Sequence, residues 1–247
     1  MDLPPVSMDL SASIERLYDV FSKYRQPAHS HSSPFSGITE HDEARLYSKP
    51  LRNLAEDDLW MYAMHAMTTW GDIAEYKHYL PRLYELLVVH PGWTDAELLI
   101  GRLDTAEWSQ WPDAERDAVI AFLHELWAWS LTIDPDDASC EGILRGFGLA
   151  GIGAARALMT WRTDRSWSAT RQIAVLLIYE RDALVTRGSL GRQWMSPVRE
   201  ELLAFLRADD TAKRLSAACH DSGGQSGADE ICDALDILER VRDPVSQ

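Results

Sequence analysis

The sequence predicts an all-α protein, and three observations support this fold class. Apolar side chains recur at intervals of three and four residues through most of the 247-residue chain. Helix-capping signals begin many of these segments, and no segment alternates apolar and polar residues as a β-strand does. We therefore expect about ten helices, arranged either as an irregular stacked array of helical pairs like that of HEAT repeats or as an irregular bundle.

The first helix is expected near the N-terminus. Apolar residues from Ile14 to Phe21 fall on one face of a helix over residues 10–25. Residues 26–38 are rich in Ser, Pro, Gly and His, which disfavours regular structure. We expect this segment, like residues 1–10, to be a poorly ordered loop.

Two further helices are predicted on either side of a glycine. Asn53 and Glu56 have the spacing of a capping box, and an apolar stripe at helical spacing continues from there to Trp70. Gly71 is expected to end this helix, and Asp72 to cap the next one.

Proline and capping residues divide the segment that follows. Pro81 either kinks the helix that Asp72 begins or opens a new turn. Thr94 and Glu97 form a second capping box. Pro112 stands at the first position of a helix that we expect to continue to Ser130, the most regular pattern in the chain.

The C-terminal half predicts the remaining helices. Residues 134–137 (Asp-Pro-Asp-Asp) have the composition of a helix start, and Ser168 and Ser196-Pro197 open two others. A glycine-rich break at 222–227 precedes the last helix. The GxGxxG sequence at 146–151 follows a helical pattern and no strand, so we interpret it as a place where two helices approach closely.

An internal similarity favours a repeat architecture within one domain over 1–247. Residues 116–123 resemble residues 199–206, and each segment has a tryptophan 11 residues before its phenylalanine. The offset of 83 residues is about twice the length of a HEAT or armadillo repeat, roughly 40 to 47 residues.

The charge distribution limits the possible partners. The net charge of −15 makes duplex nucleic acid an unsuitable partner. Residues 95–141 carry 12 acidic and two basic side chains, whereas 142–196 carry eight arginines and three acids. These arginines either pair with the acidic segment or form a site for an anionic ligand or acidic partner.

Apolar runs and cysteines bear on location. No run reaches the roughly 18 apolar residues of a membrane-spanning helix, so no membrane association is expected. Three cysteines without a CxxC pair argue against a disulfide framework and a thiolate zinc site, and favour a reducing cytoplasm. No secretory signal is visible at the N-terminus.

One pair of residues raises the possibility of metal chemistry. Glu75 and His78 have the ExxH spacing of carboxylate-bridged di-iron bundles, and His65 and Glu125 are the candidates to complete a site from facing helices. This is the basis of an alternative prediction, a small metal-dependent helical enzyme. A surface ion pair explains the same spacing without a metal.

A second group of chemically distinctive residues surrounds the predicted helix corner. Trp70, Asp72 and Lys77 belong either to a structural corner or to the lip of a ligand or partner site. With Arg156, Arg162 and Arg165 from the arginine segment, they are the predicted partner surface.

Residues 50–130 resemble an uncharacterised family of bacterial all-helical proteins. The resemblance is carried by Pro50-Leu51-Arg52, by Thr68 to Asp72 with Tyr76 to Pro81, and by Trp108 and Trp111-Pro112. It implies a helical fold and transfers no activity, substrate or catalytic residue.

The leading functional prediction is a cytoplasmic interaction or scaffold protein that presents a helical surface to a protein partner and carries no cofactor. It rests on the fold class and on the absence of catalytic motifs from the sequence. An acidic inhibitor of a basic enzyme is one specific version, motivated by the acidic segment 95–141. Exposed tryptophans would favour the interaction protein over the enzyme.

Overall fold

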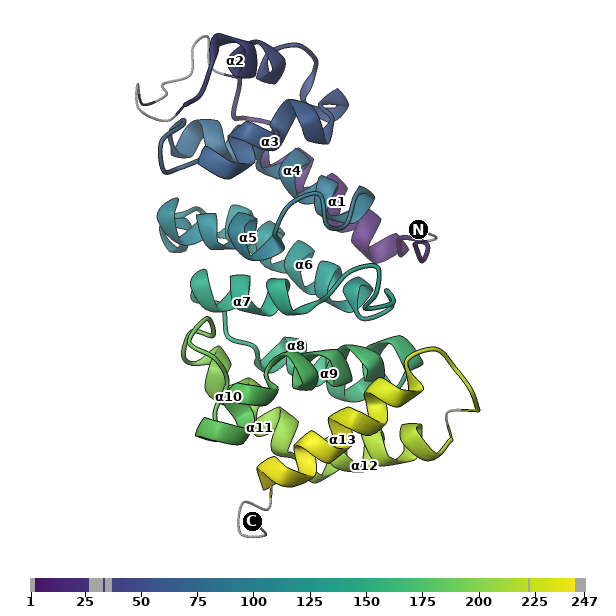
Figure 1. Ribbon diagram of the computed structural model, residues 1–247. Helices are drawn as coiled ribbons and strands as arrows, with labels where there is room; N and C mark the ends of the chain where they lie inside the picture. The colour runs from purple at the N-terminus through teal and green to yellow at the C-terminus, as the bar shows by residue number, and fades with distance from the viewer. Residues whose placement is uncertain (1–2, 27–32, 34–36, 222, 243–247) are drawn as a thin grey trace. The chain divides into compact units, whose positions relative to one another are not determined.

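The computed structural model describes residues 3–26, 33, 37–221 and 223–242. Within them the chain forms 13 α-helices, two short 3-10 helices and no β-strand, which confirms the all-α prediction (Figure 1). The helices are α1 Met8–Phe21, α2 Glu40–Leu46, η1 Leu51–Asn53, α3 Glu56–His65, α4 Ile73–Val89, α5 Ala96–Thr105, η2 Trp108–Gln110, α6 Asp113–Ser130, α7 Glu141–Leu149, α8 Ala155–Thr163, α9 Trp167–Tyr179, α10 Arg181–Arg187, α11 Val198–Arg207, α12 Asp209–His220 and α13 Ala228–Arg242. None of the helices in the described part is both long and apolar enough to cross a membrane.

The chain divides into two compact units, where the sequence predicts one domain over 1–247. The N-terminal unit comprises residues 6–126, and the C-terminal unit comprises residues 1–5 and 127–247, so the division falls within α6. Of the two predicted loops, 1–10 and 26–38, residues 1–2, 27–32 and 34–36 lie outside the described residues. Within the described part, α1 already begins at Met8.

In the N-terminal unit, α1 packs against α4, and α2 packs against α3. The core between these helices is rich in aromatic rings. The Tyr62 ring lies 4.7 Å from the Tyr79 ring and meets the Trp70 ring edge-on at 5.5 Å. Tyr84 stacks on Phe122 of α6 at 5.2 Å. These contacts bury large apolar areas at favourable ring geometries.

Two helix boundaries in this unit differ from the sequence prediction, and the course of α4 at Pro81 settles a choice that the sequence leaves open. Helix α3 ends at His65 rather than at Gly71, because Met67 has a φ of +63° and the segment turns back so that Ala66 and Trp70 form a bridge. Helix α4 continues through Pro81 to Val89. The capping group of α5 is Asp95, one residue after the predicted Thr94, because its carboxylate accepts a hydrogen bond from the Glu97 amide.

A buried charge cluster connects three parts of the N-terminal unit. Glu115 of α6 is fully buried, and its carboxylate contacts Lys23 Nζ at 2.6 Å, Lys77 Nζ at 2.8 Å and the Tyr24 hydroxyl at 2.8 Å. Burial alone would raise the pKa of Glu115, but the hydrogen bonds from Lys23, Lys77 and Tyr24 outweigh it and lower the pKa below its usual range. The cluster fastens α4 and the end of α1 to α6.

In the C-terminal unit, α13 packs along α9 and α12 (Figure 1). In the same unit, α7 packs against α11. Helix α7 approaches α11 at Gly148, where a Cβ atom would lie 3.1 Å from the Cβ of Met195. The segment 146–151 therefore serves close helix packing, as the sequence predicts.

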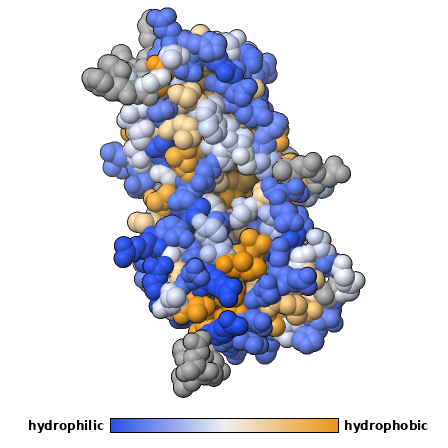
Figure 2. Space-filling view, in the orientation of Figure 1, coloured by the Kyte–Doolittle hydropathy of each residue, from blue (hydrophilic) through white to orange (hydrophobic). Residues whose placement is uncertain are grey.

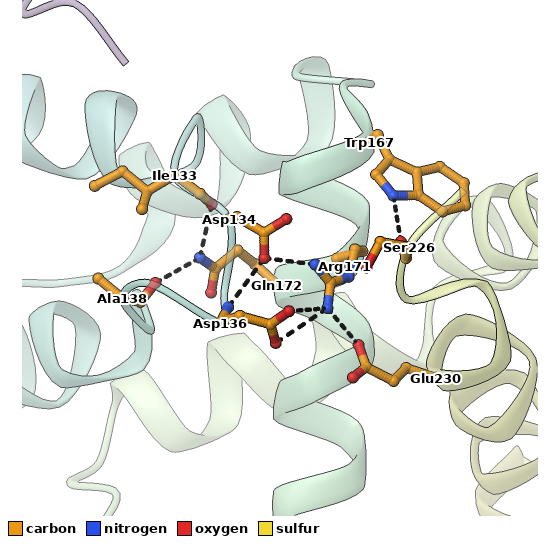
Figure 3. Close-up of polar contacts among 9 residues, drawn as sticks. All are labelled: Ile133, Asp134, Asp136, Ala138, Trp167, Arg171, Gln172, Ser226 and Glu230. Atoms are coloured by element: carbon orange, nitrogen blue, oxygen red, sulfur yellow. Dashed lines mark hydrogen bonds and ion pairs between the residues drawn. The ribbon is translucent and has the colours of Figure 1, made fainter. Parts of the chain in front are cut away.

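Arg171 of α9 gathers three carboxylates (Figure 3). Its side chain is 1% exposed, and it contacts Asp134 at 2.5 Å, Glu230 at 2.9 Å and Asp136 at 3.2 Å. Gly227 makes room for it, since a Cβ there would lie 1.9 Å from Arg171 Nε. The prediction that residues 134–137 start a helix is wrong: they form a turn whose carboxylates bind Arg171, and α7 begins at Glu141.

The Arg171 cluster shows that one arginine of segment 142–196 pairs with the acidic segment 95–141. Arg171, from the arginine segment, pairs with Asp134 and Asp136 of the acidic segment 95–141. Its neighbour Gln172 donates to the carbonyls of Ile133 and Ala138 at 3.2 and 2.9 Å (Figure 3). These bonds tie the turn to α9, so two adjacent side chains of one helix determine its position.

A disulfide between Cys219 and Cys232 joins α12 to α13. The sequence argument against disulfides is wrong for this pair. The two cysteines are 13 positions apart in the sequence, but the packing of α12 on α13 brings their Cα atoms to 5.2 Å from each other. Cys140 is a free, buried thiol, and burial raises its pKa.

We expect removal of this disulfide to destabilise the C-terminal unit by about 3 kcal/mol, because the cross-link restricts the unfolded chain. Chemical denaturation of the wild type with and without a thiol reductant, and of a Cys219→Ser, Cys232→Ser double variant, measures the effect. The reductant should not change the stability of the double variant. Equal stability of all these samples, or three titratable thiols in the non-reduced wild type, would contradict the cross-link.

We expect Glu115→Gln to lower the free energy of unfolding by about 3–5 kcal/mol, since it leaves Lys77 buried beside a neutral partner. Because the folded pKa of Glu115 is depressed, its contribution is fully present above the unfolded pKa of about 4.3. It is lost as the pH falls through the folded value. Urea titrations at several pH values test this, with the exposed Asp117→Asn on the same helix as the control; an equally mild effect of both substitutions would refute it.

Candidate functional site

Two of the predicted partner-surface residues, Trp70 and Lys77, are buried in the N-terminal unit, whereas Asp72 is exposed. Trp70 is 1% exposed and packs on Tyr62. The Asp72 carboxylate accepts a hydrogen bond from the Glu75 backbone amide at 2.8 Å and so caps α4. Lys77 is 6% exposed and pairs with Glu115. The contacts of these three residues are those of a structural corner, one of the two possibilities that the sequence leaves open.

The four predicted metal ligands are not brought into one site. His65 Nδ1 lies 2.9 Å from Thr69 Oγ1, and His78 Nδ1 lies 3.0 Å from the Tyr24 carbonyl. Glu75 is buried, Glu125 of α6 is partly exposed, and burial lowers the pKa of His78. In the part of the chain that the structure describes, no three His, Cys, Asp or Glu side chains are grouped to hold a metal ion.

The three predicted surface arginines belong to the C-terminal unit and are exposed. Arg156 and Arg162 lie on α8, and Arg165 follows that helix. Arg165 forms an ion pair with Asp210 of α12 at 2.8 Å. These residues are accessible, in contrast to the buried Trp70 and Lys77.

The exposed face of α3 carries large apolar side chains. Spacings of three and four residues place Asp57, Trp60 and Met64 on one side of the helix, opposite the buried residues Leu59 and Tyr62. Trp60 is 44% exposed and Met64 is 39% exposed. Tryptophan and methionine are enriched at protein interfaces and are poorly placed in water.

The turn after α4 extends this apolar area. The Trp93 ring meets the Trp60 ring at 6.5 Å and 65°. His90 Nδ1 lies 3.0 Å from the Glu56 carboxylate, which holds the turn against the start of α3, and the neighbouring Val89 is 48% exposed. We call the surface formed by Trp60, Met64, Val89 and Trp93 the Trp60 face.

Carboxylates predominate along one edge of the Trp60 face. Glu56 and the exposed Asp57 lie in the first turn of α3, and Asp95 is two residues after Trp93. Two arginines are also near: Arg45 lies 3.6 Å from Asp57, and Arg102 donates to the Met64 carbonyl at 2.7 Å. Three carboxylates against two arginines leave an excess of one negative charge along this edge.

The C-terminal unit exposes a second apolar group, but its charges are balanced. Figure 2 shows apolar side chains gathered over α9, and Ile178 at the end of that helix is 37% exposed. A shallow cavity beside Ile178 is lined by two arginines and two aspartates, Arg181, Arg240, Asp233 and Asp236. This group gives no preference for the charge of a partner, whereas the Trp60 face does.

Sequence reasoning missed Trp60 and Trp93. The sequence does indicate the exposure of Trp60, because this residue lies outside the apolar stripe of its own helix, between the acidic residues of the first turn and Met64. A tryptophan on the polar side of an amphipathic helix has no core to enter. For Trp93, only the fold places the ring beside Trp60.

No protein-family model, curated protein or solved structure matches this chain. The resemblance of residues 50–130 to a bacterial helical family therefore stays a prediction.

We expect the Trp60 face to contribute little to stability. Trp60→Ala with Met64→Ala should lower the free energy of unfolding by about 1 kcal/mol or less, because a substantial part of each side chain is already exposed to water. Trp70→Ala should cost about 3–5 kcal/mol, since it empties a buried site. Denaturant titrations of the two variants measure the difference. If the double variant loses as much stability as Trp70→Ala, Trp60 and Met64 belong to the core.

Proposed function

We propose that this chain is an interaction protein that binds a basic segment of a partner protein on the Trp60 face. The observation that carries the proposal is the contact of the exposed Trp60 with the partly exposed Trp93 beside an acidic edge. Tryptophan is among the residues that contribute most to binding energy at interfaces, and the charges around it select the partner.

The chemistry of the surface defines the partner. A lysine or arginine of the partner can lie over an indole ring and gain a cation–π contact, while Asp57 or Asp95 accepts its hydrogen bonds. Aliphatic side chains on the same segment cover Met64 and Val89. The net charge of −15 supports a basic partner through long-range attraction. An inhibitor of a basic enzyme is a function of this kind.

The proposal keeps the cytoplasm as the expected compartment, although the cysteine argument for it no longer holds now that Cys219 and Cys232 are paired. The alternative, a metal-dependent enzyme, has no observation in its favour, because His65 and His78 have other partners. The interaction proposal requires neither a metal nor a cofactor.

Capture with matched variants tests the proposal. Wild type, the Trp60→Ala, Met64→Ala double variant and Met159→Ala are immobilised and exposed to extract of the source organism, and bound proteins are identified by mass spectrometry. Met159 of α8 is 58% exposed and lies in the other unit, so its variant controls for the loss of an exposed apolar side chain.

We expect wild type and Met159→Ala to retain the same basic proteins. The double variant should retain at least about tenfold less of them, which is the loss that a hot-spot substitution causes. In a direct titration with the purified captured protein, the binding affinity should fall as the salt concentration rises from about 0.05 to 0.3 M, since screening reduces the electrostatic attraction. The same captured set on all three samples, or salt-independent binding, would overturn the proposal.

A further inference from the structure

A cavity of about 620 Å³ opens in the C-terminal unit, on the face formed by the start of α9, by α12 and by the segment after α12. Three cationic side chains line it, Arg165, Lys213 and Arg214. Its size is that of small-molecule sites in general. The cavity shares no residue with the Trp60 face and lies in the other unit, so its function is independent of the one proposed above.

Arg214 is the buried cation of this cavity. It is 8% exposed, its Nε donates to Thr170 Oγ1 at 2.8 Å, and its Nη1 donates to the Trp161 carbonyl at 2.7 Å. Among the described residues its Nη2 has no hydrogen-bond partner, and no carboxylate forms an ion pair with it. The guanidinium is oriented by two neutral acceptors, and its charge lacks a direct counter-charge.

Arg171, a buried arginine of the same unit, has the counter-charges that Arg214 lacks. Arg171 is equally enclosed and has three carboxylates within 3.2 Å. Burial, reinforced by the charge of Arg165, lowers the pKa of Arg214 to about 10. A buried cation left without an anion is costly, so an anion that enters the cavity gains the interaction that the protein omits.

The other charges leave the cavity positive. Arg165 is already neutralised by Asp210, at 2.8 Å. Lys213 is exposed and has no ion pair in the described part of the chain. The only other carboxylate of the lining is Asp221, after α12. Lys213 and Arg214 together thus offer two positive charges, against one from Asp221.

The lining also includes aromatic and apolar side chains. Trp167, the first residue of α9, donates from Nε1 to the Ser226 carbonyl at 3.0 Å, which fixes the indole against the segment after α12 (Figure 3). Ala217 and Ala218 of α12 also line the cavity. The first turn of α9 carries no acidic residue, although the carboxylate of Asp164 accepts a hydrogen bond from the amide of the capping residue Ser166.

We propose that this cavity binds a phosphate monoester with an aromatic body, the phosphate at Lys213 and Arg214 and the ring against Trp167. A phosphate dianion matches two unpaired cations better than a carboxylate, which carries one charge. Guanidinium and ammonium groups are the usual donors to phosphate oxygens, and the indole supplies a stacking surface. The ester comes either from a free small molecule or from a phosphotyrosine in a protein.

Titrations followed by ¹H–¹⁵N spectra of the indole groups test the site. Trp167→Phe identifies the Trp167 Nε1–H resonance among those of the ten tryptophans. The probes are phenyl phosphate, inorganic phosphate, benzoate and a short phosphotyrosine peptide. The variants are Arg214→Gln, Lys213→Gln, Trp167→Leu and, as a matched control, Arg156→Gln, an exposed arginine outside the cavity.

We expect phenyl phosphate to shift the Trp167 resonance saturably and to bind at least about tenfold more tightly than benzoate or inorganic phosphate. Lys213→Gln and Arg214→Gln should each weaken it about tenfold or more, while Arg156→Gln leaves it unchanged. Trp167→Leu, followed on neighbouring resonances, should remove the advantage of phenyl phosphate over inorganic phosphate. Lys213 is exposed, so its variant keeps the test valid if Arg214→Gln fails to fold.

The two sources of the ester give different results. Tighter binding of the phosphotyrosine peptide than of phenyl phosphate assigns a protein ligand, and equal or weaker binding assigns a free small molecule. Absence of saturable binding by phenyl phosphate, or binding that Lys213→Gln and Arg214→Gln leave unchanged, overturns the proposal. Neither result affects the Trp60 face, whose test uses different variants and probes.

Discussion

The requirement that a buried charge find its counter-charge organises this protein. Glu115 is fully enclosed and has two lysines and a tyrosine hydroxyl around it. Arg171 is enclosed and has three carboxylates. Each cluster connects helices far apart in the sequence, so charge pairing determines which segments meet in the core of each unit. Arg214 is the exception, and a cavity lies beside it.

The two units differ in what they offer to other molecules. The N-terminal unit presents tryptophan, methionine and valine beside carboxylates, a combination suited to a basic protein surface. The C-terminal unit presents a hollow with lysine and arginine beside an indole, which suits a compact anion with a ring. In both, an aromatic side chain supplies contact area and the neighbouring charges select the ligand.

Local sequence signals predicted some parts of the structure and failed at others for physical reasons. The helix that follows Pro112 was predicted from proline, first-turn acids and apolar spacing, all of which act within a few residues. Residues 134–137 carry similar helix-start signals, yet Arg171 holds their carboxylates in a turn. Trp70 and Lys77 looked like surface residues, because nothing near them in the chain shows that Tyr62 and Glu115 enclose them.

The sequence by itself determined the all-α class, most helix positions, the net charge and the separation of acidic and arginine-rich segments, because these depend on local periodicity and composition. Only the tertiary structure decided which tryptophans are accessible, which cysteines pair and which arginine lacks a carboxylate. Exposure and pairing depend on contacts between residues distant in the chain, such as Trp60 with Trp93, Cys219 with Cys232 and Arg214 with Trp161. No local pattern encodes those distances.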